Sequence, residues 1–257
     1  MKKINITITG ALGRMGKTLL KEIRRYKTFK LYNLIDLKNI KFQGFKITKL
    51  NQDCFPNTDI IIDFSRPKAC LKILKYALKF KKKLIIGTTG FTEKENKIIN
   101  KASKKIAIFK SGNMSPGVNI LEFILKIVSE KITDKYNIAI SDDHHKNKID
   151  YPSGTALMLA NAIAVGNKKK LKSMYGKSFL NKQNIFTKNK INFFIKRKGK
   201  TIGIHSVQFN NSYEKIEIKH EAFSRTLFAK GALDAAIWLD KKNKGLFNMR
   251  DMYDLKL

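Results

Sequence analysis

The chain has 257 residues, with 53 Lys and Arg against 20 Asp and Glu, which gives a formal net charge of +33. At 43% hydrophobic residues, including 17 Phe, it is too apolar for a disordered basic tail and long enough to bury a full core. Two isolated cysteines, Cys54 and Cys70, exclude a disulfide scaffold, and no apolar run approaches the roughly 18 residues that span a bilayer. The N-terminal residues lack the apolar stretch of a secretory signal. We therefore expect a cytoplasmic protein with no membrane partner.

The positive charge raises the question of nucleic-acid binding, which commonly uses an excess of Lys and Arg. Here the positive residues are spread along the whole chain, mostly as Lys among many Ile, Asn and Phe. These residue types share A/T-rich codons, so compositional drift explains the charge without selection for binding. We expect no nucleic-acid partner and keep a basic binding module as an alternative.

The first half of the chain alternates short apolar runs with segments of helical spacing. The runs expected as strands are 4–9, 29–35, 59–64, 84–86 and 106–109. Helical spacing is found at 17–23 and 69–78. Because parallel strands are buried on both faces, they read as continuous apolar runs. This half therefore predicts a Rossmann-like α/β domain with helices on both faces of a parallel sheet.

After Asn113 the pattern changes. Helices are expected at 118–131, from Ser153 onward and at 228–240, with a strand at 138–140 followed by a polar loop, and loops across 166–190. Three β-like runs follow at 192–195, 204–209 and 215–219. This half predicts a smaller α+β domain with a mostly antiparallel sheet.

A glycine-rich turn between the first strand and the first helix indicates a dinucleotide site. The segment from Ala11 to Gly16 fits the G-x-G-x-x-G pattern with Ala in the first place, and Gly10 precedes it. Glycines let the pyrophosphate approach the backbone, and the helix N-terminus offers free N–H groups. Asp36 lies twenty residues beyond Gly16, at the end of the second strand, where a carboxylate takes the ribose hydroxyls of NAD. An ordinary glycine turn is the alternative.

The same acid bears on the choice of cofactor. Asp36 favours NADH because its charge repels a 2′-phosphate, whereas Lys38 could pair with that phosphate. We expect the protein to use both NADH and NADPH, with NADH at least as good.

Two of the four histidines are adjacent, in the dense segment from Asp142 to Thr155. His144 or His145 can serve as a general acid near neutral pH, and Lys148 offers a fixed cation. The Pro152-to-Thr155 segment opens a helix whose N–H groups suit a carboxylate. Adjacent histidines beside a lysine do not favour a metal site, so we expect none. A solvated polar loop without chemistry is the alternative.

At these residues the chain resembles the dihydrodipicolinate reductase family of bacterial lysine and diaminopimelate synthesis, over nearly its whole length. The histidine, lysine and Pro-Ser-Gly-Thr block is the most specific part. The other segments that carry the resemblance are Gly10 to Gly16, Asp63 to Pro67, Gly87 to Phe91, Asn113 to Asn119, Gly203 to His205, His220 to Ala222 and Phe228 to Ala232.

The resemblance implies an NAD(P)H-dependent reductase that forms a homotetramer. Its dinucleotide-binding domain would comprise 1–114 with 223–257, and its substrate-binding and tetramerisation domain 115–222. The implied cofactor contacts, with Asp36 and Lys38 added from the pattern above, are Gly10, Ala11, Leu12, Gly13, Arg14, Met15, Asp36, Lys38, Gly87, Thr88, Thr89, Ser111, Gly112, Asn113 and Met114. His144 and Lys148 match the catalytic residues, and His145, Gly154 and Thr155 match substrate contacts.

The implied substrate is 4-hydroxy-tetrahydrodipicolinate, which loses its hydroxyl group to give a cyclic, unsaturated imine with two carboxylates. The enzyme reduces this imine to tetrahydrodipicolinate. Hydride comes from the nicotinamide and the proton from His144. Leu37 stands where many members carry a basic residue for the NADPH phosphate. His205 and His220 are expected to be structural. A semialdehyde or amino-acid dehydrogenase is the other alternative, but such an enzyme would need a catalytic Cys or a different Lys/Asp pair.

Overall fold

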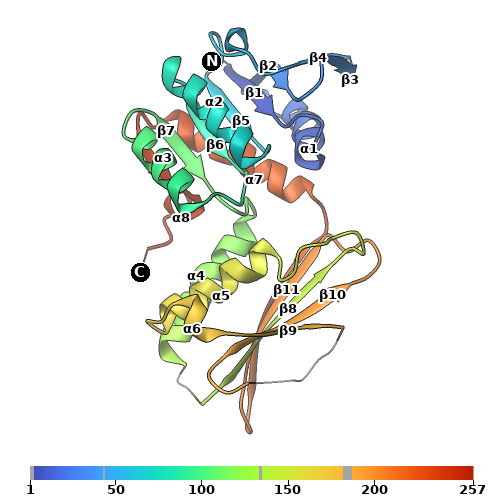
Figure 1. Ribbon diagram of the computed structural model, residues 1–257, viewed down its shortest axis with the longest axis vertical. Coiled ribbons are helices and arrows are strands. Elements are labelled where there is room, and N and C mark those ends of the chain that lie inside the picture. The colour runs from blue at the N-terminus through green and yellow to red at the C-terminus, as the bar shows by residue number, and fades with distance from the viewer. Residues whose placement is uncertain (1–2, 43, 133–134, 182–186, 257) are drawn as a thin grey trace. The chain divides into compact units, whose positions relative to one another are not determined.

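The computed structural model describes residues 3–42, 44–132, 135–181 and 187–256. The chain forms two compact units. Unit 1 consists of Met1–Ser115 and Arg225–Leu257, and unit 2 of Pro116–Ser224. Figure 1 shows the helices and strands of both units.

Unit 1 is built on an eight-stranded sheet in the order β13-β7-β6-β5-β1-β2-β4-β3. Its strands are β1 (Ile4–Thr9), β2 (Phe29–Ile35), β3 (Ile40–Phe42), β4 (Phe45–Thr48), β5 (Ile60–Asp63), β6 (Lys83–Ile86), β7 (Ala107–Lys110) and β13 (Gly245–Phe247). Only the edge pairing of β3 with β4 is antiparallel. β1 pairs with β2 on one side and β5 on the other, so the chain order reverses there, and ligands of such sheets bind at the strand ends beside this point.

Helices cover both faces of this sheet, as Figure 1 shows. α1 (Arg14–Glu22) and α7 (Thr226–Asp240) pack on one face, and α2 (Pro67–Lys79) and α3 (Glu93–Ser103) on the other; the short α8 (Met249–Met252) follows β13. Successive residues of a strand point to opposite faces, so Ile60 and Ile62 join the core beneath α1 and α7 while Ile61 joins the core beneath α2 and α3. The unbroken apolar runs therefore reflect burial on both sides.

Unit 2 has a five-stranded sheet in the order β12-β11-β8-β10-β9. Its strands are β8 (Asn137–His144), β9 (Tyr175–Leu180), β10 (Ile191–Arg197), β11 (Gly203–Asn210) and β12 (Lys215–Ala222). Two helices, α4 (Pro116–Lys131) and α5 (Gly154–Gly166), pack together and bury one face of the sheet, and the short α6 (Leu171–Met174) precedes β9. Ile138 and Ile140 of β8 lie in this core.

The fold class predicted from the sequence is confirmed, but details of unit 2 differ. The sheet is mixed rather than mostly antiparallel, because β8, β10 and β9 run parallel and only β11 pairs antiparallel with both β8 and β12. Loops were expected over 166–190, but α6 and β9 form there; residues 182–186 lie outside the described residues. β9 is an edge strand whose residues are mostly exposed, so it carries no apolar alternation that a pattern could detect.

A second difference concerns β8. It extends to His144 instead of ending at Ile140, so Asp142 and His144 belong to a strand and not to a loop. The pairing with β10 and β11 holds these polar residues in the sheet.

Among the described residues, no helix combines the length and the apolar character that crossing a membrane requires.

Replacing Gly231 of α7 with Ala should destabilise unit 1. A Cβ at this position would lie 1.8 Å from the backbone O of Met114, so either the helix or the neighbouring segment would have to shift. Overpacking of this kind costs about 1–3 kcal/mol, which exceeds the gain from the higher helix propensity of Ala. Urea unfolding followed by circular dichroism should show the loss.

Gly112→Ala is the matched control, because a Cβ there meets only Thr89 Cγ2 at 3.8 Å, an ordinary contact. Its effect should stay within about 0.5 kcal/mol. Equal unfolding midpoints for the two variants would contradict the close approach of α7 to Met114.

Candidate active site

The residues predicted to bind the cofactor follow the carboxyl ends of parallel strands in unit 1. Gly10 follows β1, Asp36 follows β2, Gly87 follows β6 and Ser111 follows β7. β7 and β6 are neighbours, as are β1 and β2, and β5 lies between the two pairs. These five strands run parallel, so the segments that follow them lie at one edge of the sheet, where doubly wound proteins bind their ligands.

The glycine-rich turn depends on close backbone contacts. Gly10 has φ +72°, and a Cβ there would lie 2.4 Å from Phe64 O. A Cβ on Gly16 would lie 2.2 Å from Gly10 O, so this glycine lets α1 approach the turn. Gly13 is the N-cap of α1, and no side chain caps this helix end. Backbone N–H groups at such a helix start are suited to a phosphate.

Asp36 is tied to the same turn. Its Oδ2 accepts a hydrogen bond of 2.7 Å from the backbone N–H of Leu12, and its Oδ1 accepts one of 2.7 Å from Leu37 N–H. Each carboxylate oxygen can accept a further hydrogen bond, so both remain able to take a ribose hydroxyl.

A cavity of about 440 Å³ lies beside Asp36 and Gly10. Apolar side chains of Ile35, Leu50 and Ile73 line it together with four basic residues, Lys49, Arg66, Lys68 and Lys72. Lys38, which the sequence suggested for the NADPH phosphate, is exposed and does not line this cavity. The sequence alone does not bring these four residues together, because Lys49 follows β4 whereas Arg66, Lys68 and Lys72 lie at the start of α2.

Thr88, a predicted nicotinamide-side residue, also binds the buried carboxylate of Asp63. Its Oγ1 donates to Asp63 Oδ2 at 2.7 Å and accepts from Ser65 N–H at 2.9 Å. Asp63 is fully buried, and its Oδ1 accepts hydrogen bonds from Thr9 Oγ1 (2.5 Å) and Ser65 Oγ (2.6 Å). Asp63 therefore joins the ends of β1, β5 and β6.

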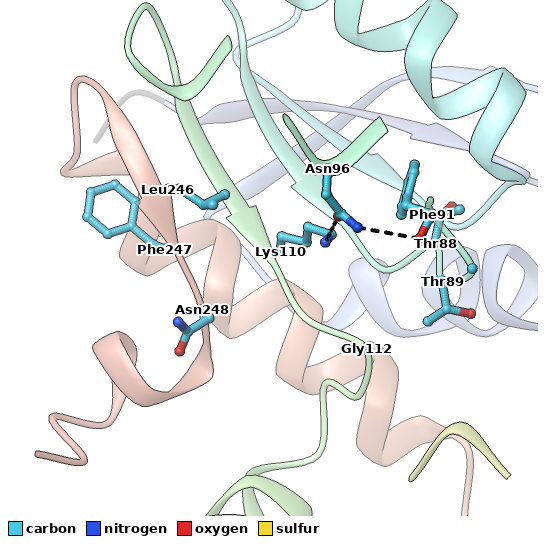
Figure 2. Close-up of a pocket in the computed structure, with 10 residues that line it drawn as sticks. Thr88, Thr89, Phe91, Asn96, Lys110, Gly112, Leu246, Phe247 and Asn248 are labelled. Carbon is cyan, nitrogen blue, oxygen red and sulfur yellow. Dashed lines mark hydrogen bonds between the residues drawn. The ribbon is translucent and has the colours of Figure 1, made fainter. Parts of the chain in front are cut away.

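A second cavity of unit 1, of about 360 Å³, is lined by Thr88, Thr89 and Gly112, together with residues from α3, β7 and β13 (Figure 2). Lys110 donates to Asn96 Oδ1 at 2.6 Å, and Asn96 donates to Phe91 O at 3.4 Å. Burial lowers the pKa of Lys110. Three of the predicted nicotinamide-side residues therefore line one cavity.

Three further predicted nicotinamide-side residues, Ser111, Asn113 and Met114, lie in the segment that follows β7. Ser111 Oγ donates to Asn113 O at 2.7 Å, and Asn113 Oδ1 accepts from Ser115 N–H at 2.8 Å. Met114 is buried in the core beneath α1 and α7, so its side chain packs there.

In unit 2, His144 ends β8 with its ring largely buried. Its Nδ1 lies 2.9 Å from Oδ1 of Asp142, a carboxylate with no exposed surface. The two groups form an ion pair only while the His144 ring is protonated. The ring of His205 stands edge-on to His144, with centroids 5.1 Å apart.

Burial and neighbouring charges shift the pKa values here. Burial alone would raise the pKa of Asp142, but the donors of His144, His205 and Ser153 around it hold the pKa well below its usual range. Burial lowers the pKa of His144, and the Asp142 carboxylate offsets only part of this effect. Burial also lowers the pKa of His220, with a contribution from His205.

Lys148 lies in the loop between β8 and α5. Its Nζ donates to both carboxylate oxygens of Asp150, at 2.8 and 2.7 Å. α5 begins at Gly154, where an added Cβ would meet nothing within 4 Å, and Ser153 Oγ caps the helix by accepting from Ala156 N–H. The loop therefore brings a cation and an open helix start onto the same strand-to-helix connection as His144, His145 and Thr155.

Neither cysteine is suited to nucleophilic catalysis. Cys54 and Cys70 are both buried, and burial beside Asp63 raises the pKa of the Cys70 thiol far above its usual value. A semialdehyde-dehydrogenase mechanism, which needs a reactive thiolate, is therefore disfavoured.

Three donor atoms, from Asp142, His144 and His205, lie within 4.8 Å of one another, as in some metal sites. Arg197 Nη2, however, lies 3.0 Å from Asp142 Oδ2, so a cation already neutralises this carboxylate. The cluster fits proton chemistry better than metal binding.

Asp142 and Arg197 were not among the site residues predicted from the sequence. A signal for Asp142 does exist, because Ile138, Ile140, Asp142 and His144 alternate along one face of β8. Arg197 carries no comparable signal, since it reaches Asp142 only through the pairing of β10 with β8.

The doubly wound sheet of unit 1, with its glycine turn and Asp36, defines a dinucleotide-dependent oxidoreductase. The family model "Dihydrodipicolinate reductase, N-terminus" matches residues 4–114, and "Dihydrodipicolinate reductase, C-terminus" matches residues 117–253. The chain belongs to the dihydrodipicolinate reductase family.

Relatives with this family's activity in their names align with nearly the whole chain. The chain is 48% identical over 258 residues to the 4-hydroxy-tetrahydrodipicolinate reductase of Pelagibacter ubique, with 100% of both chains covered. It is 46% identical to that of Buchnera aphidicola subsp. Cinara cedri, with 97% of each covered.

Solved structures share the fold. A dipicolinate-bound dihydrodipicolinate reductase from Paenisporosarcina sp. TG-14 superimposes with a TM-score of 0.77 at 19% identity, covering 98% of this chain and 99% of that one. The aspartate dehydrogenase of Thermotoga maritima gives a TM-score of 0.52 at 16% identity, covering 94% and 98%.

The lowered pKa values of His144 and His220 predict a pH-dependent stability. Below the ordinary histidine pKa of about 6.5, the unfolded chain binds protons that the folded chain does not, so the free energy of unfolding should fall as the pH drops from about 6.5 to 5. His144→Gln removes one of these groups and should make the decline shallower. Urea unfolding at a series of pH values measures both slopes.

The range from pH 7.5 to 8.5 is the internal control, because there these histidines are neutral in the folded and the unfolded chain and the two proteins should show equal slopes. An equally steep decline for both below pH 6.5 would contradict the lowered pKa of His144.

Proposed function

We propose that this chain reduces 4-hydroxy-tetrahydrodipicolinate to tetrahydrodipicolinate with NADH or NADPH, in lysine and diaminopimelate biosynthesis. Relatives that carry the reductase name are 38–48% identical over almost the whole chain. The observation that carries the proposal for this chain is the strand-to-helix connection of unit 2, where a buried histidine, a lysine and an open helix start follow one another.

The described residues of unit 1 fit a nicotinamide dinucleotide. The turn has no room for side chains at Gly10, beside Phe64 O, or at Gly16, beside Gly10 O, and it leads into an uncapped helix start. Gly10, Ala11, Leu12, Gly13, Arg14 and Met15 would hold the pyrophosphate, and Asp36 the adenosine ribose. Gly87, Thr88, Thr89, Ser111, Gly112, Asn113 and Met114 would line the nicotinamide side.

The cavity beside Asp36 supports binding of either cofactor. Its apolar residues suit an adenine ring, and its four basic side chains can offset the repulsion between Asp36 and a 2′-phosphate. Lys38, exposed on the same connection as Asp36, can approach that phosphate from solvent. Many family members carry a basic residue for the NADPH phosphate where this chain has Leu37. The basic residues of this cavity would take its place.

Loss of the 4-hydroxyl group as water leaves a cyclic, unsaturated imine, and the nicotinamide, when bound, would supply the hydride that adds to one carbon of this ring. His144 holds the proton that the adjacent ring carbon receives, and with Nδ1 beside Asp142 the transfer falls to Nε2. Lys148 and the N–H groups at Gly154 and Thr155 neutralise the two carboxylates and orient the ring, with His145 as a further contact. Because Lys148 is paired with Asp150, a substrate carboxylate has to compete for its ammonium group.

We assign unit 1 as the dinucleotide-binding domain and unit 2 as the substrate-binding and tetramerisation domain. The protein is expected in the cytoplasm as a homotetramer, as its family membership supports. Sedimentation equilibrium of the purified chain would test the assembly.

A coupled assay tests the proposed function. The purified protein should oxidise NADH only when pyruvate, aspartate semialdehyde and the preceding synthase are all present, because together they generate the substrate. NADH oxidation without the synthase, or none with it, would overturn the proposal.

The variant His144→Gln should lower kcat by about 10²-fold or more, because it removes the general acid. Binding of NADH, measured by fluorescence titration, should remain intact, since all the cofactor residues lie in unit 1. Lys148→Gln is the matched comparison, and it should also raise the KM for the substrate. A near-normal kcat for His144→Gln would remove this residue from the acid role.

The two cofactors should have comparable KM values, with that of NADH at least as low as that of NADPH. Lys38→Gln should raise the KM for NADPH and leave that for NADH unchanged, because only NADPH carries the 2′-phosphate. Steady-state kinetics with both cofactors decides this. A wild-type KM for NADPH tenfold below that for NADH would refute the expectation.

A further inference from the structure

Asp142 is a buried charge that the reaction as described does not use. Its carboxylate has no exposed surface, yet four donors surround it. Oδ1 lies 2.9 Å from His144 Nδ1 and 3.3 Å from His205 Nε2, while Oδ2 lies 3.0 Å from Arg197 Nη2 and accepts from Ser153 N–H at 2.7 Å. A buried carboxylate requires such compensation, and removing one partner of a buried pair is costly.

The sheet register assembles this cluster. On β8, Asp142 and His144 are two residues apart and share a face. Across the sheet, Arg197 of β10 stands opposite His144, and His205 of β11 stands opposite Asp142. Three strands therefore bring their side chains to one point at the end of the sheet.

We propose that the buried pair of Asp142 and Arg197 is a positioning element for the proton donor: Asp142 fixes the ring of His144 through Nδ1, so that Nε2 delivers the proton, and Arg197 holds Asp142 in place. This inference rests on the proposed function, which assigns the donor role to His144. Asp142 and Arg197 do not touch the substrate in this role.

The surroundings of His144 Nε2 support proton delivery from this nitrogen. The nearest atom to a Cβ placed on Gly203 would be His144 Nε2, at 3.2 Å. A glycine at this position therefore leaves space beside the nitrogen that the proposal assigns to proton delivery, while Nδ1 faces the carboxylate.

Arg197 also ties the loop of Lys148 to the same carboxylate. Its Nη1 donates to the backbone O of Asp142 at 2.6 Å, and its Nη2 donates to the backbone O of Asp150 at 2.9 Å. Asp150 in turn holds Lys148. One guanidinium thereby fixes the donor strand and the loop that carries the second catalytic residue.

Nitrogen-15 NMR of the histidine rings tests the positioning directly, and only four histidines need assignment. In the wild-type protein labelled with ¹⁵N-histidine, long-range ¹H–¹⁵N spectra distinguish the two neutral tautomers. We expect the neutral ring of His144 to carry its proton on Nδ1, facing Asp142. A proton on Nε2 would overturn the proposal. Because this measurement uses the wild-type chain, it decides the matter even if a variant fails to fold.

Kinetics of Asp142→Asn give the second test. The amide keeps the shape but removes the charge, so kcat should fall about 10²-fold while the KM for NADH stays unchanged. The alkaline limb of the kcat/KM profile should move to lower pH, because protonated His144 loses its counter-charge and still faces Arg197 of β10, His205 of β11 and Lys148 of the loop. An unchanged limb in a folded variant would overturn the proposal.

Asp143→Asn is the matched control, since Asp143 is the next residue of β8, points to the opposite face and is only half-buried. Its kcat should stay within about twofold of the wild type, and the alkaline limb of its kcat/KM profile should not move, because this side chain lies on the face of β8 opposite to His144. An inactive wild-type enzyme would refute the proposed function. An active wild-type enzyme with the other tautomer would refute only the positioning role.

Discussion

A carboxylate with no access to water must be surrounded by donors, and both units of this protein are organised around one. Asp63 in unit 1 accepts hydrogen bonds from three hydroxyl groups at the ends of three strands. Asp142 in unit 2 has a guanidinium, two imidazoles and a backbone N–H around it. These donors offset the desolvation of the buried charges only when the strand ends lie in register. Each carboxylate therefore holds in place the segments that carry the predicted site residues.

The two carboxylates differ in what they support. The partners of Asp63 are neutral hydroxyl groups, which hold backbone segments in place beside the predicted cofactor residues. The partners of Asp142 include ionisable rings and an arginine. Burial lowers the pKa of His144, the Asp142 carboxylate offsets part of this effect, and His205 lowers the pKa further. A network of neutral hydroxyl groups in one unit and a network of titratable groups in the other thus follow from the kinds of side chains that meet there.

A few of the basic residues behind the net charge of +33 have specific contacts or line a cavity. Four basic residues line the cavity beside Asp36, Arg197 neutralises Asp142, and Lys148 is paired with Asp150. Such residues can attract a dianionic substrate and a pyrophosphate over a distance, because the whole field steers small anions. Most of the remaining lysines have no place in the site.

The sequence by itself determined the doubly wound sheet and the positions of the glycine turn, Asp36, His144 and Lys148. These are local signals: apolar runs of β length, a glycine spacing and a rare cluster of titratable residues. The sequence missed β9, because an exposed edge strand has no apolar face, and it ended β8 too early. Only the tertiary structure decided that Arg197 and His205 meet Asp142 beside the candidate donor. These contacts arise from strand register between segments 50 or more residues apart, which no local pattern encodes.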